Sequence, residues 1–482
     1  MSLIPRPLAA LALCGLLLNC GTLNTSQTVP LGGGDNTDLV SPGGVGDDSL
    51  FIGLAFSGGG HRASAFSYGL LQELLRSPSP GDDPAGLAAE VEFIAAVSGG
   101  AVTATWFGLN GPEALDQFRA RYLLEDGERY MASDPFDADI IARGLSTGIN
   151  ARDTFGRWLD QGLFRGATFA DLQRSRVQIA ITASDNAGAA PFVFGPDIFD
   201  VLCADLARLP LSEAVAASAA LPVIFSPIVI AAKPAGCTTG APAWINALPP
   251  GAADDPAMRT YAQTLRRYAD PGFNQPVTLS DGGMTDAFGV TGFIAARARS
   301  GTAHGPLSAE QAVRLRHMLF LVVDSSIERR NPLIDRLAPG GRLLGLSVFG
   351  MGLRLDNDRN DLELAQAYET IGATTARGFS SYQAALTDWH RDVIAYRCGL
   401  APEQVIALRG TAADWDCRDL QLFVGEVSFA NLPPDLRTYM NNVPTRLNLP
   451  AEAIDASVQA GRIATRSTPA FVAFIRAIAA GN

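Results

Sequence analysis

The chain has 482 residues, of which 47% are hydrophobic and 18% charged, so it can bury a large core and is not intrinsically disordered. Its formal net charge is −12 and Lys233 is its only lysine. Such a surface attracts neither nucleic acid nor anionic lipid headgroups, so we expect no nucleic-acid partner. Any contact with a membrane surface would have to be apolar or covalent.

The first twenty residues resemble an export signal. Arg6 gives a positive start, and residues 8–18 form an apolar stretch too short to span a bilayer. Cys20 follows Leu-Leu-Asn, which is similar to a bacterial lipoprotein cleavage box, and Cys14 is a second candidate. We therefore expect a signal peptide over residues 1–20 and a protein of the bacterial cell envelope. It would be lipid-anchored at Cys20 and face the periplasm or the exterior, with a plain signal peptide as the alternative.

Residues 21–48 are rich in Gly, Asp, Ser, Thr and Pro without apolar periodicity, which predicts a flexible linker. The folded part then begins with a strand over residues 51–56 and a helix over 62–76. A second apolar strand leads into Ser98, and a helix over 101–107 follows. This βαβα order predicts an α/β fold with a mainly parallel central sheet sandwiched by helices in three layers.

The later elements continue this pattern. We expect strands at residues 177–183, 192–194, 225–230, 277–280 and 318–324, and helices at 113–122, 211–220, 256–268 and 288–299. After about residue 330 the pattern becomes helical, with long segments near 362–397 and 451–480. The sequence therefore predicts one α/β domain over residues 49–330 and a mainly helical extension over 331–482 packed on it.

A glycine-rich loop, Ser57-Gly58-Gly59-Gly60-His61-Arg62, connects the first strand to the first helix. Its glycines let successive N–H groups point into one cavity, and the helix N-terminus adds positive potential, so the loop can stabilise an anion. It lacks the GxxxxGK[ST] pattern of a P-loop, and Ala63 replaces the last glycine of a dinucleotide fingerprint. We interpret it as an oxyanion hole, in which each donor is typically worth ~3 kcal/mol. Nucleotide binding is the alternative.

Ser98 lies in Ala96-Val97-Ser98-Gly99-Gly100, where the second strand ends. This is the GxSxG pattern of a nucleophile elbow with Ala96 in place of the first glycine. The strained turn exposes the serine hydroxyl, and the flanking backbone passes so close to its neighbours that only Gly or Ala fits. The pattern predicts that Ser98 is a nucleophile, although an ordinary strand-to-helix connection could contain the same residues.

A third segment, Ser280-Asp281-Gly282-Gly283, ends the strand predicted at residues 277–280. Sites in α/β proteins form at the carboxyl edge of the sheet, and paired glycines let a carboxylate approach another segment closely. We interpret Asp281 as the partner of Ser98. The alternative is an ordinary Asp-Gly turn.

Together the three segments resemble the patatin-like phospholipase family, which carries a GGGxR loop, a GxSxG elbow and an Asp-Gly-Gly or Asp-Gly-Ala in this order. The stretch Ala216-Ala217-Ser218-Ala219-Ala220-Leu221-Pro222 is also similar to that family's ASxAxP helix end. The resemblance covers roughly residues 50–330, with Ala63 and Ala96 as departures from the family pattern.

The resemblance implies a serine acyl hydrolase of lipid esters, without a cofactor, that uses a Ser–Asp dyad. Ser98 would attack the ester carbonyl, Asp281 would accept its proton, and Gly58, Gly59, Gly60 and Arg62 would stabilise the oxyanion. Ala96, Gly99, Gly100, Gly282 and Gly283 would support this geometry. Because an ordinary Asp, with a pKa near ~3.9, is a weak base, we expect Asp281 to be buried and hydrogen-bonded to Ser98.

The four histidines offer no obvious base for the alternative, a Ser-His-Asp esterase, which needs a histidine in a loop after a late strand. His390 lies on a predicted helix, His317 begins a strand, His304 lies in a Gly-rich loop and His61 occupies the variable position of the oxyanion loop. A different alternative is a non-catalytic envelope lipoprotein that uses the fold to bind lipid or a protein partner.

Four further cysteines follow Cys20, and none forms a CxxC pair or a cluster with histidines, so we expect no metal site. An even number in an exported protein favours disulfides. Among the three connectivities we predict the pairs closest in sequence, Cys203 with Cys237 and Cys398 with Cys417. Four buried thiols are the alternative.

Overall fold

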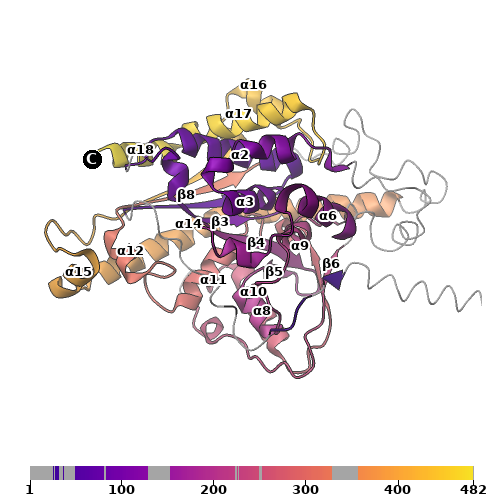
Figure 1. The fold of residues 1–482 in the computed structure, drawn as a ribbon, viewed down its shortest axis with the longest axis horizontal. Coiled ribbons are helices and arrows are strands. Elements are labelled where there is room, and N and C mark those ends of the chain that lie inside the picture. The colour runs from indigo at the N-terminus through magenta and orange to yellow at the C-terminus, as the bar shows by residue number, and fades with distance from the viewer. Residues whose placement is uncertain are drawn as a thin grey trace, which may run out of the picture.

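The computed structural model describes residues 25–26, 28–31, 36, 49–80, 83–128, 152–222, 225, 227–248, 252–327 and 357–480 (Figure 1). It confirms the α/β fold, because a central sheet carries helices on both faces and a mainly helical segment ends the chain. The predicted signal peptide, with Cys14 and Cys20, lies outside the described residues.

In the described part the sheet contains nine strands in the order β1-β6-β7-β4-β3-β2-β8-β9, with β5 paired to β4. The run β4-β3-β2-β8-β9 is parallel, whereas β5 and β7 pair antiparallel with β4 and β6 pairs antiparallel with β7. The bounds are β1 Thr25–Ser26, β2 Leu50–Phe56, β3 Val91–Ala96, β4 Gln178–Asp185, β5 Ala190–Val193, β6 Ile228–Ile230, β7 Val277–Ser280, β8 His317–Asp324 and β9 Gln421–Ser428.

Strand β2 shows why both faces of the sheet are covered. All seven of its residues are buried, and alternate side chains point to opposite faces. Leu54 and Phe56 join one apolar core, while Phe51 and Ala55 join a second. A strand buried on both sides needs a helical layer on each face, which is the three-layer architecture that the sequence predicts.

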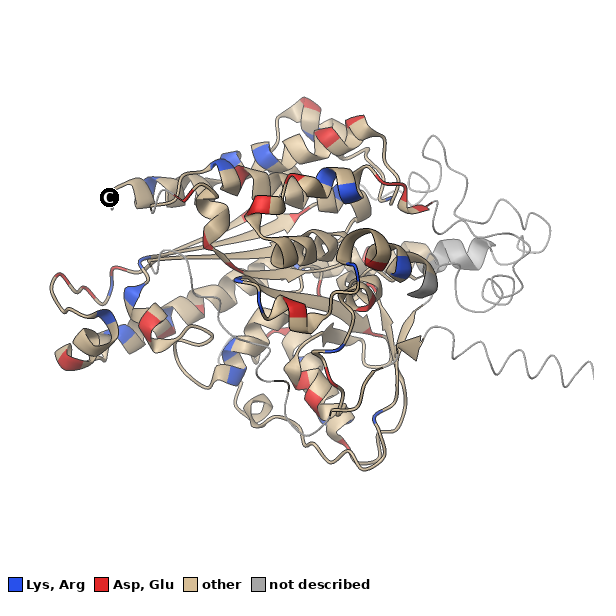
Figure 2. Ribbon diagram, viewed as in Figure 1, with Lys and Arg blue, Asp and Glu red and all other residues tan. Residues whose placement is uncertain are grey.

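The first core is covered by the following helices: α2 Gly60–Arg76, α3 Gly99–Asn110, α9 Leu211–Ser218, α10 Pro256–Ala269, α17 Ala451–Ser467 and α18 Pro469–Ala480. The second core is covered by α11 Thr291–Ser300, α12 Ala309–Arg314 and the long α14 Asn357–Cys398. Shorter helices are α6 Arg157–Leu159, α7 Phe169–Leu172, α8 Pro196–Val201, α15 Pro402–Arg409 and α16 Pro434–Met440. In the ribbon of Figure 2 the charged residues are mainly on the peripheral helices and loops, whereas α3 contains none.

Two sequence-based elements differ from the structure. The helix predicted at residues 113–122 is replaced by a 3-10 turn, Pro112–Ala114, and a π-helical turn, Arg119–Leu123. Strand β9 was not predicted. It lies at an end of the sheet, most of its residues are only partly buried, and a charged Glu426 interrupts its apolar run, so its pattern resembles that of a loop.

The prediction of a flexible linker over residues 21–48 is wrong in part. Thr25 and Ser26 form β1, which pairs parallel with β6. The Asn36 side chain is 4% exposed, donates hydrogen bonds to Asp200 and the Ala204 carbonyl, and accepts one from the Leu206 N–H. These contacts are made by backbone and side-chain amide groups rather than by apolar side chains. The segment therefore has no apolar periodicity from which its structure could be predicted.

The carboxy-terminal third is not a separate layer on a finished domain. Strand β9 extends the sheet beside β8, and α17 packs along α2, as Figure 1 shows. A Cβ atom added to Gly69 of α2 would lie 2.1 Å from the Val458 carbonyl oxygen, and one added to Gly461 would lie 2.0 Å from that of Phe66. These two glycines allow the helix backbones to touch, so the boundary predicted at residue 330 separates parts of one core.

Both predicted disulfides are confirmed, since Cys203 is bonded to Cys237 and Cys398 to Cys417. Each closes a short loop, of 34 and 19 residues in sequence separation, and so restricts the unfolded chain. In the described part of the chain, no helix combines the length and apolar character needed to span a bilayer.

Candidate active site

Ser98 occupies a sharp turn between β3 and α3. Its backbone has φ 53° and ψ −123°, a conformation that costs of order 1–3 kcal/mol for a residue other than glycine and that persists only when its surroundings enforce it. The side chain is buried but lines a pocket, and the positive end of α3 begins at the next residue. This is the strained strand-to-helix geometry of a nucleophile elbow.

The two glycines after Ser98 are required by close backbone approaches. A Cβ atom on Gly99 would lie 2.3 Å from the Gly60 carbonyl oxygen, and one on Gly100 would lie 2.6 Å from that of Ser57. The elbow therefore rests directly on the glycine-rich loop. Ala96, the departure from the GxSxG pattern, is fully buried in the first core.

The glycine-rich loop places its backbone beside the Ser98 hydroxyl. A Cβ atom on Gly58 would lie 3.6 Å from Ser98 Oγ, and Gly59 and Gly60 adopt φ values of 139° and 60° that favour glycine. No backbone carbonyl among the described residues accepts from the N–H groups of Gly58, Gly59 or Gly99. These groups are positioned as donors for an anion that forms next to Ser98.

Asp281 reaches the same pocket from β7, and its side chain is 5% exposed. Its Oδ1 accepts the Gly283 N–H at 2.9 Å, and its carbonyl accepts the Ser184 hydroxyl at 2.8 Å. A Cβ atom on Gly282 would lie only 2.1 Å from the Thr182 carbonyl oxygen, so glycine is needed for this loop to lie against β4. The burial expected for Asp281 is present, and its hydrogen bond with Ser98 stays a prediction.

The strand that carries Asp281 runs in a different direction from the sequence-based expectation. That expectation placed it at the carboxyl edge of a parallel strand, whereas β7 is antiparallel to β4, with Ser184 opposite Ser280. Strand β4 continues beyond the level of Ala96, which pairs with Ile181, so β7 runs back along this overhang toward the elbow. The register of β7 against β4, rather than a parallel strand direction, therefore places the Asp281 carboxylate at the pocket.

The end of α9 joins the elbow to the Asp281 loop. The Ser218 hydroxyl accepts the Ser98 N–H at 2.8 Å and donates to the Thr182 carbonyl at 2.6 Å, while the Ala220 carbonyl accepts the Asp281 N–H at 2.8 Å. One short segment therefore fixes the backbone of both proposed dyad members. The sequence contains this segment within the stretch similar to ASxAxP, but residue pattern alone gave Ser218 no role.

Hydrogen bonds from Arg62 to backbone carbonyls hold the glycine-rich loop in place, and its expected role as an oxyanion donor stays a prediction. Its guanidinium is buried, Nε donates to the Ser325 carbonyl at 3.2 Å, and Nη1 donates to the Val443 carbonyl at 2.6 Å. The side chain lines the pocket but ties the glycine-rich loop to β8 and to the carboxy-terminal third.

None of the four histidines, all of which are described, lines the pocket that contains Ser98. His304 and His390 bind backbone carbonyls, at Leu307 and Leu420. His61 is fully buried against Tyr122 and Trp158, and burial lowers its pKa from 6.5 to about 3, so it is neutral at ordinary pH. The geometry therefore gives no support to a Ser-His-Asp triad.

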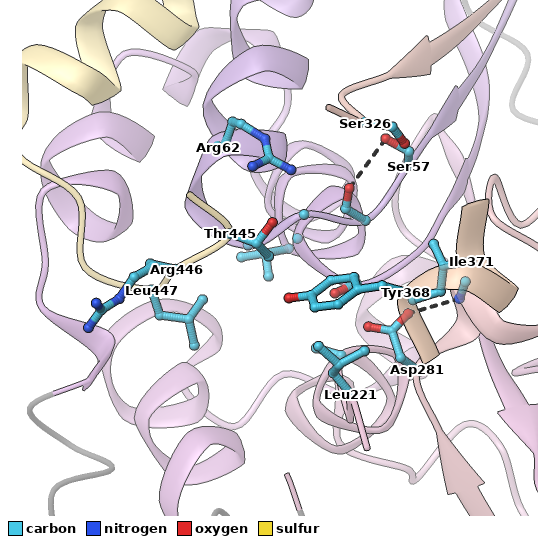
Figure 3. A pocket seen from close by; sticks show the side chains of 18 of the residues that line it. Ser57, Arg62, Leu221, Asp281, Ser326, Tyr368, Ile371, Thr445, Arg446 and Leu447 are labelled. Atoms are coloured by element: carbon cyan, nitrogen blue, oxygen red, sulfur yellow. Dashed lines mark hydrogen bonds between the residues drawn. The ribbon is translucent and has the colours of Figure 1, made fainter. Parts of the chain in front are cut away.

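The pocket occupies about 1030 Å³ including its open mouth, and most of its wall is apolar. Figure 3 shows Asp281 beside Tyr368, with Leu221 close by, and Thr445, Arg446 and Leu447 across the pocket. Its apolar lining residues are Val102, Tyr122, Phe155, Leu221, Phe225, Ile327, Tyr368, Ile371 and Leu447.

Several pocket residues come from parts of the chain that showed no functional pattern. Tyr368, Ile371 and Thr375 lie on α14, and residues 445–447 precede α17. The sequence could have indicated Ser326 as a pocket residue, because Ser326 follows the apolar strand β8 at the carboxyl edge of the sheet. Among the described residues, no group of three or more His, Cys, Asp or Glu side chains could hold a metal ion.

Comparisons with known proteins place the chain in a family. The family model described as patatin-like phospholipase matches residues 54–294, which is half of the chain. No curated protein sequence matches this chain significantly.

Among solved structures, human GIVD cytosolic phospholipase A2 is similar, with 11% identity and a TM-score of 0.40, covering 99% of this chain and 65% of that one. The same human protein in complex with a methyl gamma-linolenyl fluorophosphonate inhibitor and terbium chloride shows 12% identity and a TM-score of 0.26, covering 60% and 42%. This chain thus spans about two thirds or less of the length of either. The motifs, the fold and the family match together show that the chain belongs to the patatin-like phospholipase family.

Proposed function

We propose that this protein is a serine hydrolase that cleaves fatty acyl esters of lipids through a Ser98–Asp281 dyad. One observation carries the proposal: a strained serine, a buried carboxylate and a row of glycine N–H groups line a single, mostly apolar pocket. The nucleophile, the base and the anion site required for acyl transfer are thus gathered around one space. Membership in the patatin-like phospholipase family supports the same reaction class.

The reaction would proceed in two balanced steps. Ser98 Oγ attacks the ester carbonyl carbon while Asp281 takes the hydroxyl proton, and the oxyanion accepts hydrogen bonds from the glycine-rich loop. The ester bond then breaks, Asp281 returns its proton to the leaving alcohol, and acyl-Ser98 remains. Water next attacks the acyl group and gives a proton to Asp281, and the collapse of the second oxyanion returns that proton to Ser98 Oγ as the fatty acid leaves.

The apolar wall supports a lipid substrate. Leu221, Phe225, Tyr368 and Ile371 lie together in a small apolar cluster at the side of the pocket where Asp281 lies. An acyl chain placed there would gain roughly 0.8 kcal/mol for each methylene removed from water. A phospholipid, a lysolipid or a glyceride could each supply such a chain.

The proposal predicts that Ser98→Ala abolishes hydrolysis of p-nitrophenyl esters and of a panel of phospholipids, lysolipids and triglycerides. The expected loss in kcat is roughly 10⁵-fold or more, because the nucleophile is removed. Asp281→Asn should lower kcat by roughly 10³-fold or more, because the base is lost while the shape is kept. Released acids identified by mass spectrometry would also define the preferred lipid.

A matched control is His390→Ala, because that histidine binds a backbone carbonyl away from the pocket. Loss of turnover in His390→Ala but not in Asp281→Asn would refute the dyad. Equal release by wild type and Ser98→Ala would instead favour a non-catalytic lipid-binding protein.

We also propose that the protein is held at a membrane through a lipid on Cys20. Strand β1 begins at Thr25 and is part of the sheet, so a chain of five residues can place a lipid at most about 18 Å from it. A short tether of this kind would keep the pocket close to lipid substrate. Cys20→Ser should move the protein from the membrane pellet to the soluble fraction, and unchanged pelleting would contradict the anchor.

A further inference from the structure

The glycine-rich loop is held by a segment far away in the sequence, residues 443–447, which we call the clamp loop. The Arg446 carbonyl accepts the His61 N–H at 2.9 Å, and the Val443 carbonyl accepts Arg62 Nη1 at 2.6 Å. A Cβ atom on Gly60 would lie 2.6 Å from the Arg446 carbonyl oxygen, so the two backbones are in direct contact. The N–H groups beside Ser98 are therefore positioned partly by the clamp loop.

The clamp loop is in turn fixed by an ion pair at the wall of the pocket. Arg446 binds Glu128 through two hydrogen bonds, one of them from Nε to Oε1 at 2.8 Å. Glu128 Oε1 also accepts the Leu447 N–H at 3.2 Å, and the Leu447 carbonyl accepts the Gly127 N–H at 3.0 Å. The Arg446 and Glu128 side chains are only 10% and 12% exposed, and both line the pocket.

This arrangement is stiff for physical reasons. A guanidinium and a carboxylate that meet through two hydrogen bonds fix both distance and orientation, which a single-point contact does not. Partial burial shields the pair from water, so water weakens this ion pair less than it weakens an exposed one. Any shift of the Arg446 backbone is passed to the glycine-rich loop beside Ser98, because the Arg446 carbonyl accepts the His61 N–H.

We infer that Glu128 and Arg446 are positioning residues that hold the oxyanion loop in its working shape, which makes the carboxy-terminal third part of the catalytic machinery. Arg446 lies outside residues 54–294, the range that the family model matches. The inference rests on the proposed function, since it assigns a role in forming the oxyanion. Its expected signature is a lower kcat with little change in KM, because donors that act in the transition state are displaced while the acyl wall remains.

The test uses the full chain and two isosteric substitutions. Glu128→Gln keeps the shape and the acceptor for Leu447 but removes the charge. Asp419→Asn is the matched control, since Asp419 also binds buried Arg397, is 17% exposed and does not line the pocket. Arg446→Ala is the stronger variant, and added guanidinium ion can enter the space that it leaves, because that space opens into the pocket.

We expect Glu128→Gln to lower kcat roughly 10- to 100-fold with KM within about threefold of wild type, and Asp419→Asn to leave both unchanged. Guanidinium should restore part of the kcat of Arg446→Ala and leave wild type unaffected. Equal kcat in Glu128→Gln and Asp419→Asn, or a loss confined to KM, would overturn the inference.

A second measurement is independent of activity. Hydrogen–deuterium exchange in a peptide covering residues 57–65 should be roughly fivefold or more faster in Glu128→Gln than in wild type, because the His61 N–H loses its fixed acceptor. Asp419→Asn should exchange like wild type. Unchanged exchange in Glu128→Gln and Arg446→Ala would overturn the inference even for an active enzyme. An inactive wild type with faster exchange in the variants would instead refute the proposed function and leave the clamp supported.

Discussion

The segments proposed to carry the chemistry contrast sharply with the carboxy-terminal third that contacts them. Around residues 58–62, 96–100 and 281–283, several glycines stand where crowding by neighbouring backbone or a positive φ disfavours a side chain, and Ser98 itself has a positive φ. Residues 357–480 contain no such pattern, yet they supply β9, the helix that contacts α2, and five residues of the pocket wall besides the clamp arginine.

The difference shows which parts of a functional site can be recognised from the sequence. Chemistry needs particular side chains in strained or crowded backbone, and this restricts residue type. Support is given largely by main-chain atoms: the carbonyl groups of Val443 and Arg446 accept from Arg62 and His61. A carbonyl group is the same in every residue, so the clamp loop carries no motif.

The largest effect in this comparison is expected at the contact of α2 with α17. Gly461→Ala should destabilise the fold by about 3 kcal/mol or more, because its Cβ would lie 2.0 Å from a backbone oxygen that cannot move without separating the helices. Chemical denaturation of the purified variant measures this loss.

The control for Gly461→Ala is Gly372→Ala on α14, where nothing lies within 4 Å of the added Cβ. That variant should be stabilised by roughly 0.5–1 kcal/mol, because alanine favours a helix more than glycine does. If Gly461→Ala and Gly372→Ala had similar stability, the backbones of α2 and α17 would not be in close contact.

The next effect concerns His61, where the two regions meet. Burial lowers its pKa from 6.5 to about 3, so between these values the unfolded chain binds a proton that the folded chain does not. The free energy of unfolding therefore falls as the pH falls from 6.5 toward 3, by roughly 1.4 kcal/mol per pH unit from this group. At pH 4.5 the total loss of unfolding free energy from His61 is roughly 2.5 kcal/mol.

His61→Phe keeps a ring against Tyr122 but cannot take up a proton. The difference in unfolding free energy between variant and wild type should shift by roughly 2.5 kcal/mol in favour of the variant between pH 7 and pH 4.5. Urea titrations at the two pH values measure it. A constant difference would mean that His61 is not buried in the neutral form.

The smallest effect lies within the chemical region. Ser218→Ala should cost about 2 kcal/mol of stability and lower kcat about tenfold, because the Ser98 N–H and the Thr182 carbonyl lose a buried partner. Ser212→Ala is the control on the same helix, since its hydroxyl makes only a 3.5 Å contact with Asp160. Equal behaviour of the two variants would remove Ser218 from the support of the elbow.

The sequence was informative where side-chain pattern has a local cause. Strand β2 and helix α2 follow from apolar periodicity, the elbow from its glycines, and both disulfides from short spacing in a chain that begins with a predicted export signal. It was misleading where the cause is distant. Strand β9 is stabilised by its pairing with β8, and Arg62 is directed by carbonyl groups 263 and 381 residues away.

The sequence by itself determined the three-layer α/β class, the order of the motifs and the residues proposed to attack, accept a proton and donate to an oxyanion, because those properties reside in single residues and their immediate neighbours. Only the tertiary structure decided that β7 runs antiparallel and still brings Asp281 to the pocket, that part of the predicted linker joins the sheet, and that the last third of the chain binds the glycine-rich loop. The physical reason is that register, close backbone packing and main-chain hydrogen bonds arise between segments hundreds of residues apart, and no local composition encodes them.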